Sequence, residues 1–514
     1  MRALDRTKNT KRNILWGFGY KFVALLSPFI TRTLLIYCLG AEYLGINSLY
    51  VSVLQVLNLA ELGFSTAVVY SMYKPVAEGD TFQVAAFLNY FKTVYRWVGV
   101  AILIMGAFIL PILDYLVTGE VPADVNMQLA FCIYLANASL SYFLYAYKQS
   151  LLNAYQRNDA INKVNMAIIA AQCLLQSTVL LIWPNFYAFA LIMPVCTVAS
   201  NLATAVVVRR LLPEFSDLSL LDARLNDKER IEIRKRVAGL VFSQLCRVSR
   251  NSFDNIIISS FIGLVAVASY GNYFVIMSGL LGVLGTIGTS MTAAVGNSVA
   301  VESKEKNFDD MRLFVFLYAM ISTVCCACML ACYQPFMRIW VGDDLMLPML
   351  IPVLMSVYFY VATMGDIRTV YVNATGIWWK LKWRALAEAL SNLVLNLLLV
   401  QLFGLPGVVS ATILSLFFLN FLYGSHLTFK HYFGMKYVRF YYIDHFIYMM
   451  MAIVVCVATY FVIGFIPYGG GVPNLLLKAM ASVLVSSSIL LVVFFWTKRF
   501  KRAISFAKHV ITHR

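Results

Sequence analysis

The chain has 514 residues, of which 61% are hydrophobic and 13% are charged, and its mean hydropathy is +0.76. This balance excludes a soluble globular protein, which needs more polar surface than such a chain supplies. The formal net charge of +16 raises the question of nucleic-acid binding. Most of the basic residues, however, fall in short segments between apolar runs, which is typical of membrane topology. We therefore expect a membrane protein with no nucleic-acid partner.

Long apolar runs recur from near residue 13 to near residue 496. A transmembrane helix needs about 20 apolar residues, and about fourteen such helices fit the chain, so we predict an all-α polytopic membrane protein. Because no small-residue cleavage site follows the first run, we expect that run to be a retained helix. The predicted spans are 13–39, 44–71, 92–117, 127–151, 161–183, 186–208, 237–262, 267–297, 312–334, 347–372, 385–403, 406–428, 443–467 and 474–496.

The connections between these spans separate by charge into two alternating sets. One set holds the basic segments, including 209–236 and the tail at 498–502, whereas the other set has Arg338 as its only basic residue. Since basic loops stay in the cytoplasm, we place both termini there. The outward loops are short and leave no room for an extracytoplasmic catalytic domain. We therefore expect the function to lie between the helices.

The longest cytoplasmic connection divides the chain into two groups of six helices and a final pair. At a constant offset of 226 residues, Lys21 aligns with Arg247 and Gly45 with Gly271, although a chance match of apolar letters is the alternative. Repeats of six helices predict two lobes around a central cavity, an arrangement typical of transporters. The predicted domains are an N-lobe of helices 1–6 (1–208), a cytoplasmic linker (209–236), a C-lobe of helices 7–12 (237–430), and helices 13–14 with a basic cytoplasmic tail (431–514).

Ionisable residues inside spans are costly, about 2.5 to 3.5 kcal/mol on insertion scales, and they usually face a bundle interior or a watery cavity. In helix 1, Lys21 and Arg32 are eleven residues apart, which places them on one helical face. In helix 7, Arg247, Arg250 and Asp254 follow i, i+3, i+7 spacing and form a second stripe. We expect both stripes to face the central cavity.

Further polar residues lie in two other spans. Helix 2 carries Gln55, Asn58 and Glu61 along one band, and helix 10 carries Asp366 and Arg368. Together with the basic stripes, these residues predict a wet and cationic cavity. Such a cavity suits an anionic head group such as a diphosphate, which arginine binds bidentately and lysine binds as a point charge.

The same charges allow a structural interpretation, in which Arg247 pairs with Asp254 and Lys21 pairs with Glu61. If transport is coupled to an ion gradient, the candidate coupling groups are Glu61, Asp254 and Asp366, and the sequence leaves open whether the ion is a proton or sodium. In either case, net transport in one direction requires that the moving ion or the substrate binds the two conformational states with different affinities.

Recognisable catalytic motifs are missing from the sequence. It contains no Walker motif, metal-binding box or nucleophile elbow. The ten cysteines lie nearly all inside apolar runs without a nearby histidine, so we interpret them as packing residues. We therefore expect a protein that is not an enzyme and that holds neither a metal ion nor another cofactor.

Three segments resemble a known family. SPFITRTLLIYCLGAEYLGINSLYVSVLQVLNLAELGFSTAVVYSMYKPVAEGD near the start closely resembles the opening of bacterial polysaccharide flippases of the Wzx type. DNIIISSFIGLVAVASYGNYFVI in helices 7 and 8 and FMRIWVGDD after helix 9 are also similar to that family. The similarity spans most of the chain and is sharpest in helices 1 and 2.

This resemblance implies the fold of the multidrug/oligosaccharidyl-lipid/polysaccharide exporter (MOP) superfamily, located in the bacterial inner membrane. It implies alternating-access flipping of an undecaprenyl diphosphate-linked oligosaccharide for capsule, O-antigen or exopolysaccharide synthesis, alongside a polymerase and glycosyltransferases of the same pathway. Basic residues of helices 1 and 7 would meet the diphosphate, namely Lys21, Arg32, Arg247 and Arg250. The resemblance leads us to expect an arginine at position 21, and the lysine found there would weaken bidentate recognition.

Three alternatives remain open at this stage. A lipid II flippase would fit fourteen helices and a basic cavity equally well. A multidrug antiporter of the same superfamily would not need helices 13 and 14, and it tends to favour an acidic cavity for cationic drugs. A membrane polysaccharide polymerase or ligase would need a sizeable outer loop, which this chain lacks.

Overall fold

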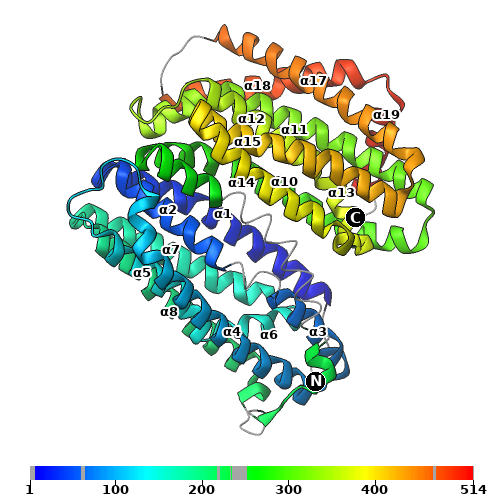
Figure 1. The fold of residues 1–514 in the computed structure, drawn as a ribbon. Coiled ribbons are helices and arrows are strands. Elements are labelled where there is room, and N and C mark those ends of the chain that lie inside the picture. Colours follow the sequence, from blue (N-terminus) through cyan, green and yellow to red (C-terminus); the bar gives the residue numbers. More distant parts are fainter. Residues whose placement is uncertain are drawn as a thin grey trace. The chain divides into compact units, whose positions relative to one another are not determined.

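The computed structural model describes residues 6–58, 64–216, 220, 222–231, 233, 252–466 and 471–512. Within these ranges the chain is helical with short turns and contains no strand. It forms two compact units, Met1–Ala268 and Ser269–Arg514, so that the boundary falls inside one long helix, α10 (Leu264–Val301). Both units are drawn in Figure 1.

The first unit is a bundle built around pairs of long helices. Helix α1 packs along α7, and α5 lies against both α4 and α8. Residues 252–261 are also helical and belong to this unit, together with the first turns of α10. The other described helices of the unit are α1 (Arg6–Cys38), α2 (Ala41–Leu57), α3 (Phe64–Glu78), α4 (Thr81–Ile109), α5 (Met127–Phe143), α6 (Lys148–Ala154), α7 (Asn158–Ile182) and α8 (Phe186–Leu211).

A buried carboxylate joins the first turns of α1 to α7. Asp159 is 0% exposed and accepts a 2.7 Å bond from Arg12 Nη2 and a 3.0 Å bond from Arg157 Nε. Lys163 Nζ lies 3.9 Å from the same carboxylate. A buried carboxylate is tolerated only when it is paired and hydrogen-bonded, so these cations fix where α1 begins against α7.

The second unit surrounds α11, which packs against α12, α17 and α18. Its last helix, α19, follows α18 after a short turn and also contacts α11. Sequence analysis described this region as a basic tail, and the structure shows that it is helical. Besides α10, the main helices of the unit are α11 (Lys304–Val341), α12 (Leu350–Met364), α13 (Asp366–Thr375), α14 (Lys382–Phe403), α15 (Leu405–Ser415), α16 (Gly424–Thr428), α17 (Val438–Gly464), α18 (Gly471–Phe494) and α19 (Lys498–Thr512), with π-helical segments η6 (Leu416–Tyr423) and η7 (Phe429–Phe433) around α16.

The described residues contain eleven helices long and apolar enough to cross a membrane. A twelfth span results if Met127–Phe143 and Lys148–Ala154, which meet at 55°, are counted as one bent helix. These twelve correspond to twelve of the fourteen predicted spans, so the polytopic all-helical fold is confirmed. The other two predicted spans, 44–71 and 237–262, each include residues outside the described ranges, and the count of fourteen stays a prediction.

Candidate functional site

The two predicted cations of helix 1 both lie on α1 but in different surroundings. Arg32 is partly buried, and its Nη2 donates to the carbonyl oxygen of Ala268 at 3.3 Å. Lys21, three turns earlier, is exposed within the first unit. Arg32 is therefore the better-positioned of the two, because a backbone contact already orients its guanidinium.

Polar side chains of α2 meet the helix at residues 252–261. Ser252 Oγ donates to Gln55 Oε1 at 3.1 Å, and Asn255 Nδ2 donates to Ser52 Oγ at 2.9 Å. On the same helix, Asp254 is 0% exposed. These contacts form a polar seam inside the first unit, and polar groups at membrane depth are typical of substrate or ion pathways.

The seam depends on a close approach of two backbones. A Cβ atom added to Gly45 of α2 would lie 2.3 Å from the carbonyl oxygen of Leu264, at the start of α10. Glycine therefore permits a contact that any other residue would prevent. At the far end of α2, Tyr142 of α5 donates its hydroxyl hydrogen to Asn58 Oδ1 at 3.3 Å.

Three predicted site residues lie outside the described ranges, namely Glu61, Arg247 and Arg250. Both members of the helix 1 stripe, Lys21 and Arg32, are thus described, whereas Asp254 is the only described member of the helix 7 stripe. The predicted ion pairs of Lys21 with Glu61 and of Arg247 with Asp254 stay predictions for the same reason.

The second unit holds a buried cluster around Arg368 of α13. Arg368 is 2% exposed, and its Nη2 donates to Asn420 Oδ1 at 2.9 Å while its Nη1 donates to the Asn420 backbone carbonyl. Asn420 Nδ2 donates in turn to Glu388 Oε2 at 3.0 Å, and Arg384 Nη1 donates to the same oxygen at 2.7 Å. Arg384 thus binds Glu388 directly and Arg368 is linked to it through Asn420, so these three ionised side chains carry one excess positive charge.

Local backbone features make room for this cluster. Asn420 lies in the π-helical segment η6, and π-helical turns occur frequently at functional sites. A Cβ atom on Gly424 would lie 2.2 Å from Arg368 Nη1, and one on Gly365 would lie 3.2 Å from Nη2. Glycine at both positions therefore leaves the space that the guanidinium occupies.

Sequence analysis missed Glu388 and Asn420. The i, i+4 spacing of Arg384 and Glu388 inside an apolar span is a signal that could have found the first, because such spacing places the two side chains on one helical face. No spacing rule connects Asn420 with Arg368, since they lie 52 residues apart on different helices.

Asp366 and Arg368 are neighbours on α13 but contact different partners. Tyr318 of α11 donates its hydroxyl hydrogen to Asp366 Oδ2 at 2.8 Å. Tyr318 also lines a small cavity of about 10 Å³ with Ser322 and His445. A cavity of this size has room for about one water molecule, and the buried Ser322 Oγ in its wall has no hydrogen-bond partner among the described residues. Asp366 is therefore hydrogen-bonded to a side chain, Tyr318, that lines a cavity large enough for one water molecule.

Each helical unit thus holds cations beside neutral hydrogen-bond groups. The described residues contain no group of three or more His, Cys, Asp or Glu side chains that could hold a metal ion.

Solved structures with a similar arrangement of helices come from transporters and a lipid flippase. A multidrug resistance MATE family transporter of the MOP superfamily, in an inward-facing conformation, matches with a TM-score of 0.62 and 15% identity, over 78% of this chain and 94% of its own. The lipid II flippase MurJ in an inward closed conformation matches with a TM-score of 0.61 and 14% identity, over 94% of this chain and 99% of its own. The chain therefore has the fold of MOP superfamily transporters.

A third similar structure is a MOP superfamily transporter from Pyrococcus furiosus, with a TM-score of 0.56 and 14% identity, over 84% of this chain and 97% of its own. No protein-family model and no curated protein matches the sequence. The likeness thus rests on the arrangement of helices.

Proposed function

We propose that the protein flips undecaprenyl diphosphate-linked oligosaccharide repeat units from the cytoplasmic to the outer leaflet by alternating access. The single observation that carries this proposal is the partly buried Arg32, a cation held in a membrane-spanning helix of the same unit as the polar seam. A fixed guanidinium favours a diphosphate and disfavours a cationic drug. The sequence resemblance to polysaccharide flippases supports the same choice.

Two features separate a lipid flippase from a multidrug antiporter. The match to the lipid II flippase covers 94% of the chain, compared with 78% for the multidrug transporter. Helices α17 and α18, the last apolar pair, pack on α11 and are part of the second unit. A lipid-linked substrate gives this pair a role, because its polyprenyl tail has to stay in contact with apolar surface throughout transport.

In this proposal Arg32 binds the diphosphate bidentately and Lys21 contributes a point charge. Arg247 and Arg250 have the same role by resemblance, although they lie outside the described residues. Gln55 and Asn58 contribute neutral hydrogen bonds near the sugar or phosphate. The proposed activity is not enzymatic, because flipping breaks no covalent bond in the substrate.

Replacing Arg32 with alanine should reduce the flipping rate about tenfold or more, since a hydrogen bond to a charged group contributes about 1.5 to 3 kcal/mol. The measurement is the appearance of a fluorescent undecaprenyl diphosphate oligosaccharide in the outer leaflet of proteoliposomes. Arg32→Lys should retain part of the rate because it keeps the charge. Arg338→Ala is the matched control, since Arg338 forms a 2.7 Å ion pair with Asp343 at an exposed site. Equal rates for Arg32→Ala and the control would contradict the assigned role.

The lipid II flippase is the second candidate, and the 94% coverage by that fold favours it. The same liposomes loaded with labelled lipid II decide between the two, because a lipid II flippase should move lipid II faster than the oligosaccharide substrate. Drug-cation antiport without lipid flipping would instead support the multidrug transporter.

We further propose that Asp366 couples transport to a proton or sodium gradient. Asp366→Asn should remove the dependence of the flipping rate on an imposed pH or sodium gradient while leaving basal flipping in place, because the amide keeps the contact with Tyr318 but does not ionise. Asp343→Asn, at an exposed ion pair, is the control and should keep the gradient dependence. Retained dependence in Asp366→Asn would assign the coupling to another group.

A further inference from the structure

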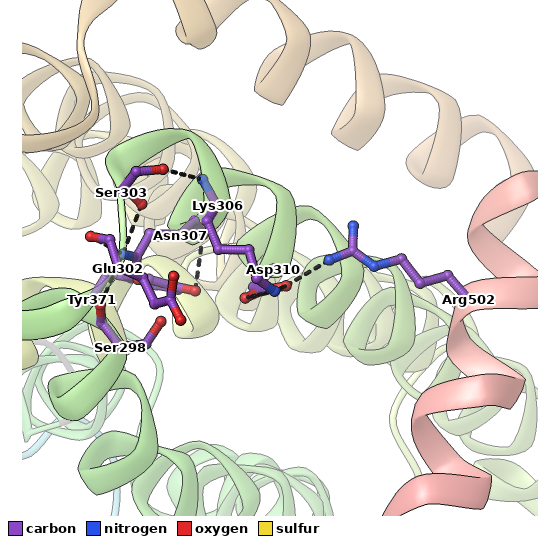
Figure 2. Close-up of polar contacts among 8 residues, drawn as sticks. All are labelled: Ser298, Glu302, Ser303, Lys306, Asn307, Asp310, Tyr371 and Arg502. Atoms are coloured by element: carbon purple, nitrogen blue, oxygen red, sulfur yellow. Dashed lines mark hydrogen bonds and ion pairs between the residues drawn. The ribbon is translucent and has the colours of Figure 1, made fainter.

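Helix α19 is held against α11 by an ion pair with a carboxylate, Asp310, that a second cation also contacts. Arg502 Nη2 lies 2.6 Å from Asp310 Oδ1, and Lys306 Nζ lies 2.9 Å from Asp310 Oδ2. Figure 2 shows Arg502 pointing from α19 across to Asp310 on α11. The three groups carry one excess positive charge at the junction of the two helices.

A second carboxylate repeats the arrangement one turn earlier on α19. Arg499 Nη2 and Arg312 Nε each lie 2.7 Å from an oxygen of Asp444 on α17. One turn after Arg502, the ring of Phe506 packs against Phe314 with 5.8 Å between centroids. The inner face of α19 is therefore tied to both α11 and α17.

Phe506 also closes one side of a pocket of about 460 Å³. Its lining is almost entirely apolar and comes from α10, α11, α13 and α19, with Asp310 as the acidic group at its edge. Representative lining residues are Ile287, Met291, Phe314, Leu317, Ile367 and Phe506. An apolar pocket with a charged edge has the chemistry of a site for an amphiphile, because a chain and a head group are accommodated side by side.

Asn307 contacts two residues that line this pocket, Ser298 and Tyr371, and all three are drawn in Figure 2. Asn307 is fully buried, and its Nδ2 donates to the backbone carbonyls of Ser298 and Ser303, which joins the end of α10 to the start of α11. Tyr371 of α13 donates to the carbonyl of Asn307 at 3.1 Å. The edge is thus preorganised, whereas the side chains of Lys306 and Arg502 remain 50% and 44% exposed.

We infer that this pocket binds an anionic phospholipid, with one acyl chain among the apolar residues and the head-group phosphate between Lys306 and Arg502. The bond to Asp310 uses Nη2 of Arg502, and a guanidinium has five N–H donors, so a phosphate is accommodated at the same side chain. The excess positive charge selects an anionic head group. The predicted topology puts the α10–α11 connection and the tail on the same side of the membrane, facing one leaflet.

The test measures phospholipid binding to the purified full chain by native mass spectrometry, using phosphatidylglycerol and phosphatidylcholine with the same acyl chains. Phosphatidylglycerol should bind more tightly, and Arg502→Gln should weaken it about fivefold, as expected for one basic residue near a lipid surface. Asp310→Asn should act in the opposite direction and strengthen it, because a carboxylate that repels the phosphate is removed. Ala294→Phe, which fills the pocket, should weaken both lipids. Arg338→Gln, a similarly exposed paired cation outside the pocket, should change neither.

Equal binding of the two phospholipids would overturn the inference. So would weaker phosphatidylglycerol binding in Asp310→Asn, because that result would mean that the ion pair only holds the helix in place. Displacement of phosphatidylglycerol by undecaprenyl phosphate at equal concentration would assign the pocket to the carrier lipid instead. None of these measurements reads out transport, so their outcome is independent of the proposed flipping activity.

Discussion

Replacing Glu388 with leucine should destabilise the second unit by about 3 to 5 kcal/mol, because breaking a buried ion pair leaves charge without compensation. Glu388 is 4% exposed and is the acceptor for both Arg384 and Asn420. Its removal leaves the guanidinium groups of Arg384 and Arg368 in the bundle with no carboxylate in the cluster. Thermal unfolding in detergent micelles, followed by tryptophan fluorescence, measures the loss.

The double variant Arg384→Leu with Glu388→Leu is the decisive companion. Replacing both partners of a buried pair by apolar residues is often nearly neutral, so the double variant should recover much of the stability that Glu388→Leu loses. Glu305→Ala is the matched exposed control, since Glu305 and Lys436 are both more than half exposed and their charged atoms lie 3.4 Å apart. This variant should leave the stability of the unit nearly unchanged, because exposed ion pairs contribute little. A double variant no more stable than Glu388→Leu would show that packing, and not charge, sets the cost.

Replacing Gly407 with alanine should destabilise the same unit by about 3 kcal/mol, the upper part of the range for overpacking a core. A Cβ atom at this position would lie 2.0 Å from the carbonyl oxygen of Leu399 and 2.5 Å from its carbonyl carbon. Both atoms belong to the backbone of α14, so the clash separates α14 from α15 and is not relieved by a change of rotamer. The melting temperature and the monodisperse fraction in size-exclusion chromatography report the effect.

Gly282→Ala on α10 is the control for Gly407→Ala. A Cβ atom there meets no atom within 4 Å in the structure, and alanine is the better helix former, so this variant should be neutral or slightly stabilising. Similar melting temperatures for the two variants would mean that the α14–α15 hairpin opens without cost.

The helices were predictable from the sequence because each span needs a long apolar run, and twelve of these runs match spans in the described residues. The bend between α5 and α6 was not predicted, since hydropathy continues across the break near Leu144. Helix α19 was read as a tail because its basic residues hide the apolar positions Phe500, Ala503 and Ile504, whose spacing fits one helical face.

The sequence indicated which residues belong to the candidate site better than it indicated which side chains those residues contact. Sequence periodicity placed Asp366 and Arg368 inside a span, but it does not indicate which other helix lies opposite each side chain. Tyr318 and Asn420 provide those partners from 48 and 52 residues away in the chain. Such contacts depend on tertiary packing and cannot be predicted from a pattern of apolar residues.

Because α11 lies at the centre of its unit, a single fluorescent label can report the movement of that unit during transport. Helices α17, α18 and α19 pack against α11, and the carboxylate of Asp444 binds Arg312 of α11 and Arg499 of α19. These three helices should therefore move together with α11 in every conformational change. A fluorophore on the outer surface of α18, for example at the exposed Val492, would then report the movement of the whole second unit. Val492 is not one of the candidate site residues, so a label there leaves every one of those side chains unchanged.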